Sequence, residues 1–336
     1  MLCIQRNQKK IIIGEINLYP LILKPTIKDY IWGGQKLKTE YNKYSEHNKL
    51  AESWELSCHK DGMSIIDNGE FCGLSLQDYI NRDRKGILGT KCCKSEYFPI
   101  LVKLIDAKDN LSIQVHPDNE YALTNEGQYG KTEMWYIIDC KPGSIIYYGL
   151  NRDLSRTEFI EKIKNNTFLD TLNAVKVKKG DVFLIESGTI HAICSNTLIA
   201  EIQQNSNITY RIYDYNRCGN DGKPRDLHIE KALDVTSLKK QKLQAEIYDI
   251  EETTYYSKQK LVECDYFTTY KVAINKEINL TADGETFHCL LCLDGILDIH
   301  YNNSNISFKK GQTIFIPANM GNYKIKGIGE ILFVTL

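Results

Sequence analysis

The sequence has no apolar run long enough to cross a membrane as a helix, which would need about 18 apolar residues in succession. Near the N-terminus, residues 11–13 are three isoleucines, a run too short for the core of a signal peptide. We therefore predict a cytoplasmic protein without a membrane partner, whose residues 1–14 form a loose extension.

The chain also lacks an excess of charge of either sign. Its 42 basic and 43 acidic residues give a formal net charge of -1. This balance provides no basic surface for nucleic acid, so nucleic acid is not an expected partner.

The eleven cysteines follow no disulfide pattern. Their number is odd and their spacing is scattered, as expected for reduced thiols in a cytosol. Cys289 and Cys292 form a C-x-x-C motif, which could hold zinc or carry out redox chemistry. The motif lies in the apolar run CLLCLDGILDI without a second such pair, so the sequence favours buried packing cysteines.

Proline is scarce, with seven residues, whereas tyrosine is frequent, with 21, a balance that favours β-strands. A chain of 336 residues exceeds what one hydrophobic core usually holds, which predicts two domains. The charged segment KKQKLQAE resembles a linker, so we place the domain boundary at about residue 245.

Two segments of the sequence are alike. Residues 178–193 read KKGDVFLIESGTIHAI, and residues 309–325 read KKGQTIFIPANMGNYKI. A strand-and-turn pattern ending at Gly143 or Gly295 precedes each segment. This repeat predicts two copies of one β unit, which we name the first and the second copy.

Helices are expected at three places in the N-terminal part. An insertion in the first copy shows helical spacing at Phe159, Ile160 and Ile163, with Asp153 or Ser155 as its N-cap. The other two expected helices cover residues 75–87 and residues 223–240.

Polar side chains recur with period two in the segment LSIQVHPD, residues 111–118. In a strand, Ser112, Gln114 and His116 share one face, because successive side chains alternate between the two faces. A lone histidine here would be an ordinary core residue, but a glutamine and a histidine two residues apart also form a ready pair of metal ligands.

Two further residues complete a candidate ligand set. Glu133 opens an apolar strand, and His191 follows a turn at the start of another. Two imidazoles with oxygen donors suit zinc, and iron or manganese also remain open. Asn322 occupies the position of His191 in the second copy, so we expect a metal in the first copy and none in the second.

Several charged residues lie in apolar segments around this set. They are Lys103, Lys131, Glu201 and Arg211. Each alone could be an ordinary charge on an edge strand. Together they indicate a pocket with cations for an anionic substrate and a carboxylate for proton transfer.

The motifs of the chain resemble those of the type I mannose-6-phosphate isomerases in their short bacterial form, which belong to the cupin superfamily. The resemblance extends from about residue 19 to residue 336. It rests on residues 32–34 (WGG), 51–57 (AESWELS), 98–106 (FPILVKLID), 111–118 (LSIQVHPD), 130–136 (GKTEMWY), 187–192 (SGTIHA) and 208–214 (ITYRIYD). One departure is Glu186, which stands where the turn of this family usually has proline.

The resemblance implies a mainly β fold of two jelly-roll barrels, a bicupin, with helical insertions in the N-terminal half. Residues 1–245 would form the catalytic zinc-binding domain, and residues 246–336 a cupin domain without metal ligands. One zinc ion per chain would bind Gln114, His116, Glu133 and His191. Catalytic roles would fall to Arg211, Lys131 and Glu201, and substrate-binding roles to Trp32, Glu52, Lys103 and Ser112.

The activity implied is the interconversion of mannose 6-phosphate and fructose 6-phosphate through a cis-enediol, by a monomer or a homodimer. Lys131 or Glu201 would transfer the proton, Arg211 would stabilise the enediolate or hold the substrate, and Ser112 with Lys103 could bind phosphate or hydroxyls. Two alternatives stay open from the residues: a metal-cupin oxygenase, and a sugar-binding cupin without catalysis.

Overall fold

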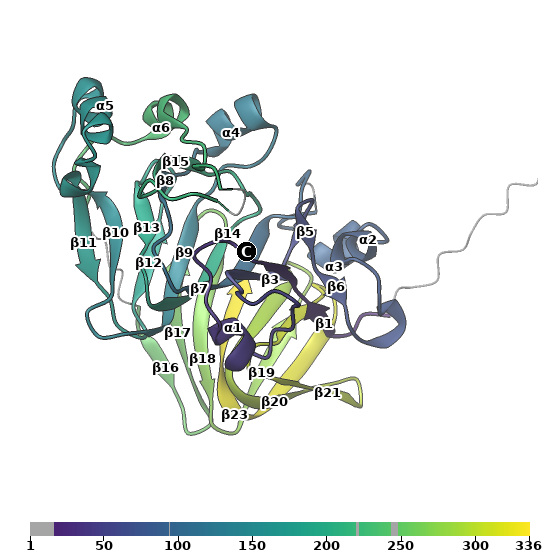
Figure 1. Ribbon diagram of the computed structural model, residues 1–336. Helices are drawn as coiled ribbons and strands as arrows, with labels where there is room; N and C mark the ends of the chain where they lie inside the picture. The colour runs from purple at the N-terminus through teal and green to yellow at the C-terminus, as the bar shows by residue number, and fades with distance from the viewer. Residues whose placement is uncertain (1–16, 94, 220–221, 243–247) are drawn as a thin grey trace, which may run out of the picture.

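A computed structural model describes residues 17–93, 95–219, 222–242 and 248–336 (Figure 1). The expected loose extension and the expected boundary near residue 245 lie outside these residues. Strands dominate, which confirms the prediction of a mainly β fold. The finer expectation of two jelly-roll barrels stays a prediction.

Two sheets form the N-terminal half. The six-stranded sheet runs in the order β12 (Val182–Ile185), β9 (Glu133–Cys140), β14 (Thr197–Gln204), β7 (Ile100–Ala107), β3 (Glu52–Leu56), β2 (Thr26–Lys28). The five-stranded sheet runs in the order β11 (Leu172–Lys176), β10 (Ile145–Leu150), β13 (His191–Ile193), β8 (Ile113–Val115), β15 (Tyr210–Tyr213). A small hairpin pairs β4 (Cys58–His59) with β5 (Gly62–Met63).

The third large sheet has ten strands, mostly from the C-terminal part. Its order is β16 (Ile250–Glu252), β17 (Tyr256–Glu263), β18 (Thr268–Ile274), β23 (Gly321–Thr335), β20 (His288–Tyr301), β22 (Thr313–Ile316), β1 (Leu21–Lys24), β6 (Ile65–Ile66). Off this path, β19 (Glu277–Ala282) pairs with β23 and β21 (Ser304–Lys309) pairs with β20. Strand β1 thus joins the C-terminal sheet, with Leu21 opposite Phe315.

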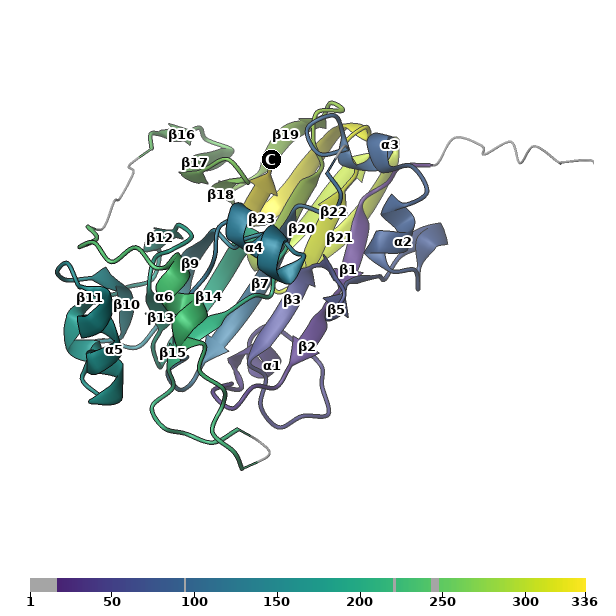
Figure 2. The same cartoon turned by 90° about the horizontal axis from the view of Figure 1, so that it is seen from above.

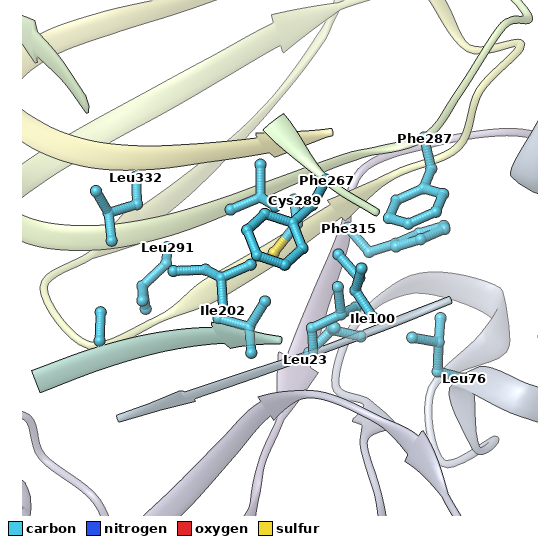
Figure 3. Close-up of a cluster of buried hydrophobic side chains, with 14 of the residues drawn as sticks. Leu23, Leu76, Ile100, Ile202, Phe267, Phe287, Cys289, Leu291, Phe315 and Leu332 are labelled. Atoms are coloured by element: carbon cyan, nitrogen blue, oxygen red, sulfur yellow. The ribbon is translucent and has the colours of Figure 1, made fainter. Parts of the chain in front are cut away.

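The six-stranded sheet lies between the other two sheets, as the view from above shows (Figure 2). One of its faces packs on the ten-stranded sheet through an apolar cluster that includes Ile100 and Ile202 on one side and Leu291 and Phe315 on the other (Figure 3). Successive side chains of a strand point to opposite faces, so Lys103 and every second residue of these strands face the five-stranded sheet. Apolar residues such as Ile105 and Ile199 also lie on this second face. Strand alternation therefore separates a wholly apolar seam from a second interior in which charged and apolar side chains are buried together.

A buried polar network also joins the two halves. Lys43 and Glu55 form an ion pair of 2.6 Å, and both side chains are almost fully buried. Ser53 donates to Glu55 Oε1 at 2.6 Å, and Thr313 of β22 donates to Glu55 Oε2 at 3.0 Å. Lys43 Nζ also donates to the carbonyl of Gly311. Hydrogen bonds and an ion pair thus connect Glu55 of strand β3 to Thr313 and Gly311 of the second copy.

The expected helices are shorter in the structure than in the sequence prediction. Residues 75–87 form two helices, α2 (Leu76–Ile80) and α3 (Arg84–Leu88), because Asp83 accepts from the backbone of Gly86 and starts a new helix. In residues 223–240, α6 spans Ile229–Val235. The other helices are α1 (Lys36–Thr39), α4 (Asn119–Glu126) and α5 (Arg156–Lys164), with 3₁₀ turns η1 (Gly69–Phe71) and η2 (Phe168–Thr171).

The insertion of the first copy folds as expected, and the structure decides between its two candidate caps. Ser155 accepts from the backbone N–H of Glu158 and caps α5. Asp153 instead accepts from the backbone N–H of Lys240 and pairs with Lys239.

The two cysteines of the C-x-x-C motif point to opposite sides of β20. Cys289 lies in the apolar seam between the halves, whereas Cys292 lies in a cluster inside the C-terminal sheet. Three residues apart in a strand, they face away from each other and cannot hold one metal ion. The prediction of buried packing cysteines is confirmed.

Candidate active site

Strand β8 places the predicted ligands in the polar interior. Ile113 and Val115 are buried in an apolar cluster on one side of the strand, so Gln114 points to the other side. The register sets His191 of β13 directly opposite Gln114. As a result, Gln114 Nε2 lies 3.3 Å from His191 Nε2.

Three buried side chains form a group that could hold a metal ion. His116, Glu133 and His191 each offer a ligand atom, and these atoms lie within 4.8 Å of one another. The Nε2 atoms of His116 and His191 are each 3.4 Å from an oxygen of Glu133. The exposed fraction of each side chain is 1% or less, so the group is closed to bulk water.

Backbone carbonyls fix the protonation of both imidazoles. His116 Nδ1 lies 2.8 Å from the carbonyl oxygen of Ile208, and His191 Nδ1 lies 2.9 Å from that of Thr189. A carbonyl oxygen only accepts, so each Nδ1 carries the proton and each Nε2 presents a lone pair to the centre. This is the arrangement that metal-binding histidines use.

The electrostatics of the group also suit a cation. Burial and then Lys131 lower the pKa of His116 to about 3, and burial lowers the pKa of His191. Burial raises the pKa of Glu133, but the neighbouring Lys131 ammonium outweighs it and holds this pKa well below its ordinary value. At neutral pH the centre therefore holds two neutral imidazoles and a carboxylate, the forms that bind metal.

A chain of alternating charges leads away from this centre. Lys131 Nζ lies 2.5 Å from Glu133 and 3.7 Å from Glu201, and Lys103 Nζ lies 3.0 Å from Glu201 and 3.7 Å from Glu52. Burial lowers the pKa of Lys103, but Glu201 and Glu52 outweigh it and raise this pKa above its ordinary value.

Two indole N–H groups fix the carboxylates of this chain. Trp54 donates to Glu52 Oε2 at 2.7 Å, and Trp135 donates to Glu201 Oε2 at 3.0 Å. Both tryptophans are fully buried, so their rings have little freedom to turn. Each carboxylate is therefore held in one orientation beside Lys103.

A cavity of about 250 Å³ opens onto these groups. The structure brings every predicted site residue to it or directly behind it, although their roles stay predictions. Lining the cavity are Trp32, Glu52, Lys103, Ser112, Gln114, Lys131, Glu201 and Arg211. His116, Glu133 and His191 lie behind Gln114 and Lys131.

The sequence analysis missed four polar residues that line the same cavity: Tyr30, Asn207, Thr209 and Arg225. Arg225 stands in a loop before α6, in a segment predicted as helix, so periodicity gave no signal for it. Arg211 lies beside it, and burial followed by Arg225 lowers the pKa of Arg211. Two neighbouring guanidinium groups indicate a site for an anion.

A mainly β fold with a buried His–Glu–His group beside a charged cavity defines a metal-dependent enzyme of the cupin type. Two family models match the chain: "Phosphomannose isomerase type I, catalytic domain" at residues 21–140, and "Mannose-6-phosphate isomerase, cupin domain" at residues 257–336. The chain belongs to the type I mannose-6-phosphate isomerase family.

Relatives of nearly equal length support this assignment. The probable mannose-6-phosphate isomerase GmuF of Bacillus subtilis is 37% identical, over 94% of this chain and 98% of that protein. Mannose-6-phosphate isomerase ManA of the same organism is 34% identical, over 93% and 98%. A crystal structure of the Bacillus subtilis mannose 6-phosphate isomerase, 34% identical, superposes with a TM-score of 0.89 over 94% of this chain and 99% of that one. In the described residues, no helix has the length and apolar character needed to span a membrane.

Proposed function

We propose that this chain interconverts mannose 6-phosphate and fructose 6-phosphate. The observation that carries the proposal is the His116–Glu133–His191 group lying next to Lys131 and Glu201 at the wall of one cavity. An aldose–ketose isomerase needs both an electrophile beside the sugar oxygens and a group that moves a proton between C1 and C2. The cavity offers both within one small volume.

We propose zinc as the metal, one ion per chain, held by Gln114, His116, Glu133 and His191. Two imidazole nitrogens, a carboxylate and an amide oxygen are donors that zinc accepts, and turning the amide of Gln114 would present its oxygen to the centre. When bound, such an ion supplies Lewis-acid chemistry by polarising the sugar carbonyl.

Glu201 is the proton-transferring base in this proposal. Its carboxylate is oriented by Trp135, and it lies at the cavity wall beside Lys103 and Lys131. Moving one proton on one face of the substrate, from C2 to C1 by way of a cis-enediol, requires a single carboxylate. Lys131, in contact with both Glu133 and Glu201, would hold a proton near the sugar oxygens.

The phosphate would lie at the end of the cavity where Arg211 and Arg225 meet. Lys103 is already balanced by Glu201 and Glu52, so we assign it to sugar hydroxyls together with Ser112. Glu52 and Trp32 would complete the wall around the sugar.

We also propose the wider organisation set out in the sequence analysis: a catalytic domain of residues 1–245, a second domain of residues 246–336, and a cytoplasmic monomer or homodimer. The ten cysteines of the described residues are free, which agrees with a reducing compartment. The sheet of the second domain also includes β1 and β6, two strands from the N-terminal part of the chain.

The test is fructose 6-phosphate formation from mannose 6-phosphate by the purified protein, before chelation, after chelation and after zinc is restored. We expect activity to be lost and then recovered, with magnesium as the control that does not restore it. Zinc-loaded protein that turns over no mannose 6-phosphate would refute the proposal. Binding of the sugar phosphate without turnover would then favour a sugar-binding protein, and oxygen uptake with iron would favour an oxygenase.

A further inference from the structure

Behind the two cavity arginines lies a buried carboxylate, Asp214. Arg225 Nε donates to Asp214 Oδ2 at 2.7 Å, and Arg225 Nη2 donates to Asp214 Oδ1 at 2.6 Å, which is a bidentate pair. Asp214 is 5% exposed, so water competes little for this pair. The pair uses two of the five N–H bonds of Arg225 and leaves three for other partners.

A second arginine, which is not part of the cavity lining, also holds Asp214. Arg217 donates to Asp214 Oδ1 through Nε at 3.1 Å and Nη2 at 2.8 Å. Arg217 also lies over the ring of Tyr215, 5.3 Å from its centroid. Arg217 does not line the cavity, so its contacts fix Asp214 and not a ligand.

The turn between Asp214 and Arg217 is strained. Tyr215 has φ 54° and Asn216 has φ 55°, both in the left-handed region that side chains other than glycine rarely adopt. These angles bring Arg217 back to Asp214, so that the backbone N–H of Arg217 also donates to the carbonyl of Asp214 at 3.2 Å. Strain of this kind persists where the surrounding contacts over-determine it, and it clusters at functional sites.

We propose that Asp214 is a positioning residue that holds Arg225 beside Arg211 and thereby builds the site for the substrate's phosphate. The inference rests on the proposed function and deepens it. Arg211 has no carboxylate within ion-pairing distance in the described part of the chain, and its Nη1 donates to the carbonyl of Asp226 at 2.8 Å.

Charge balance points to the same ligand. Three guanidinium groups surround the one buried carboxylate, so positive charge is in excess where Arg211 and Arg225 meet. A phosphate monoester carries about -1.5 to -2 at neutral pH, so it is attracted to that excess. Asp214 lowers the mutual repulsion of the arginines while fixing the direction of Arg225, so the site favours a phosphorylated sugar over a neutral one.

The test uses Asp214→Asn in the full-length, zinc-loaded protein. We expect the KM for mannose 6-phosphate to rise about tenfold or more, because charge-assisted hydrogen bonds to Arg225 are lost, while kcat changes less than about threefold. The inhibition constant of inorganic phosphate, a competitor without a sugar, should rise by a similar factor. Asp234→Asn is the matched control, since it breaks the exposed pair with Arg156 and should leave both constants unchanged.

The outcomes separate this inference from the proposed function. Turnover of mannose 6-phosphate by the unmodified protein tests the proposed function alone. An unchanged KM in Asp214→Asn, an equal loss in kcat, or a phosphate inhibition constant that does not move would each overturn the inference. Should Asp214→Asn fail to fold, Arg225→Lys decides: it keeps the charge but loses the bidentate geometry, and the same selective rise in both constants is expected.

Discussion

The two copies of the repeated β unit have a similar backbone but carry different side chains at corresponding positions. Gly180 and Gly311 both adopt positive φ, 92° and 83°, and each leads into a strand, a turn and a second strand. In the first copy the second strand starts with His191, which faces Glu133. In the second copy the corresponding residue is Asn322, which accepts from the hydroxyl of Thr281 at the surface.

The interiors differ in the same way. Next to the first copy, ionisable side chains are buried in contact with one another, from Glu133 to Glu52. Inside the C-terminal sheet, the buried cluster is apolar and includes Ile299, Phe308 and Ile325. The fold supplies a framework that tolerates both interiors, and the side chains at a few strand positions decide whether it carries chemistry.

The largest difference in metal content and kcat is expected between His191→Ala in the first copy and Asn322→Ala at the corresponding position of the second. His191→Ala should lose the metal and lower kcat by roughly 1000-fold or more, since a proposed ligand is removed. Asn322→Ala should retain metal and activity, because Asn322 is exposed and its side chain bonds to Thr281 at the surface. Elemental analysis and turnover measure both, and metal retained in His191→Ala would contradict the comparison.

The contacts of Glu55 and Lys43 with the second copy should contribute to the free energy of unfolding. Glu55→Ala leaves Lys43 buried without its partner, so the free energy of unfolding should fall by about 3–5 kcal/mol. Urea unfolding measures this. As a control, Asp234→Ala breaks a solvent-exposed pair and should cost about 1 kcal/mol or less. Similar losses in the two variants would show that Glu55 does not fasten the halves.

The C-terminal sheet also has a buried histidine, at the start of β20. It contrasts with His191, because we assign it a role in stability and none in metal binding. His288 is 7% exposed, its Nδ1 lies 2.8 Å from the hydroxyl of Tyr323, and burial lowers its pKa to about 4. The unfolded chain binds this proton from about pH 6.5 downward and the folded chain only near pH 4, so stability falls as pH falls through that window.

This histidine should account for about 3 kcal/mol of stability lost between pH 6.5 and pH 4. In His288→Leu the loss over the same window should be smaller by that amount, as urea unfolding at several pH values would measure. A pH dependence identical to that of the unmodified protein would show that His288 does not titrate as the structure indicates.

The smallest effects are expected at Trp135 of β9 and at Cys289 of β20. Trp135→Phe removes the N–H that orients Glu201, so kcat should fall by about tenfold with the metal retained. Cys289→Ala should lower the free energy of unfolding by about 1–2 kcal/mol and leave kcat unchanged. Steady-state kinetics and urea unfolding separate these effects, and an unchanged kcat in Trp135→Phe would remove the orienting role.

Strand periodicity explains how much of the site could be predicted. Gln114 with His116, and Lys131 with Glu133, stand two residues apart, and alternation alone places each pair on one face. The residues that were missed, such as Tyr30 and Arg225, reach the cavity from loops, where the path of the chain depends on tertiary contacts. The register that sets His191 opposite Gln114 is likewise a property of the sheet and not of either segment.

The same reasoning explains the errors in the helices. Residues 75–87 have helical spacing throughout, but the local competition between two caps, Ser75 and Asp83, divides the segment. In residues 223–240, Arg225 pairs with Asp214 and the chain turns into α6 only at Ile229. A tertiary contact of one side chain here overrides the pattern of the segment.

The pairing of β1 with β22 has a consequence for how the protein is made. Strand β1 is synthesised long before β22, its neighbour in the sheet. Until then β1 presents an unpaired edge, and such edges recruit other chains. Folding therefore has a long-range closing step, which slows it. For the same reason, a C-terminal fragment expressed alone would lack two strands of its sheet, β1 and β6, and would leave the edge of β22 unpaired and open to aggregation.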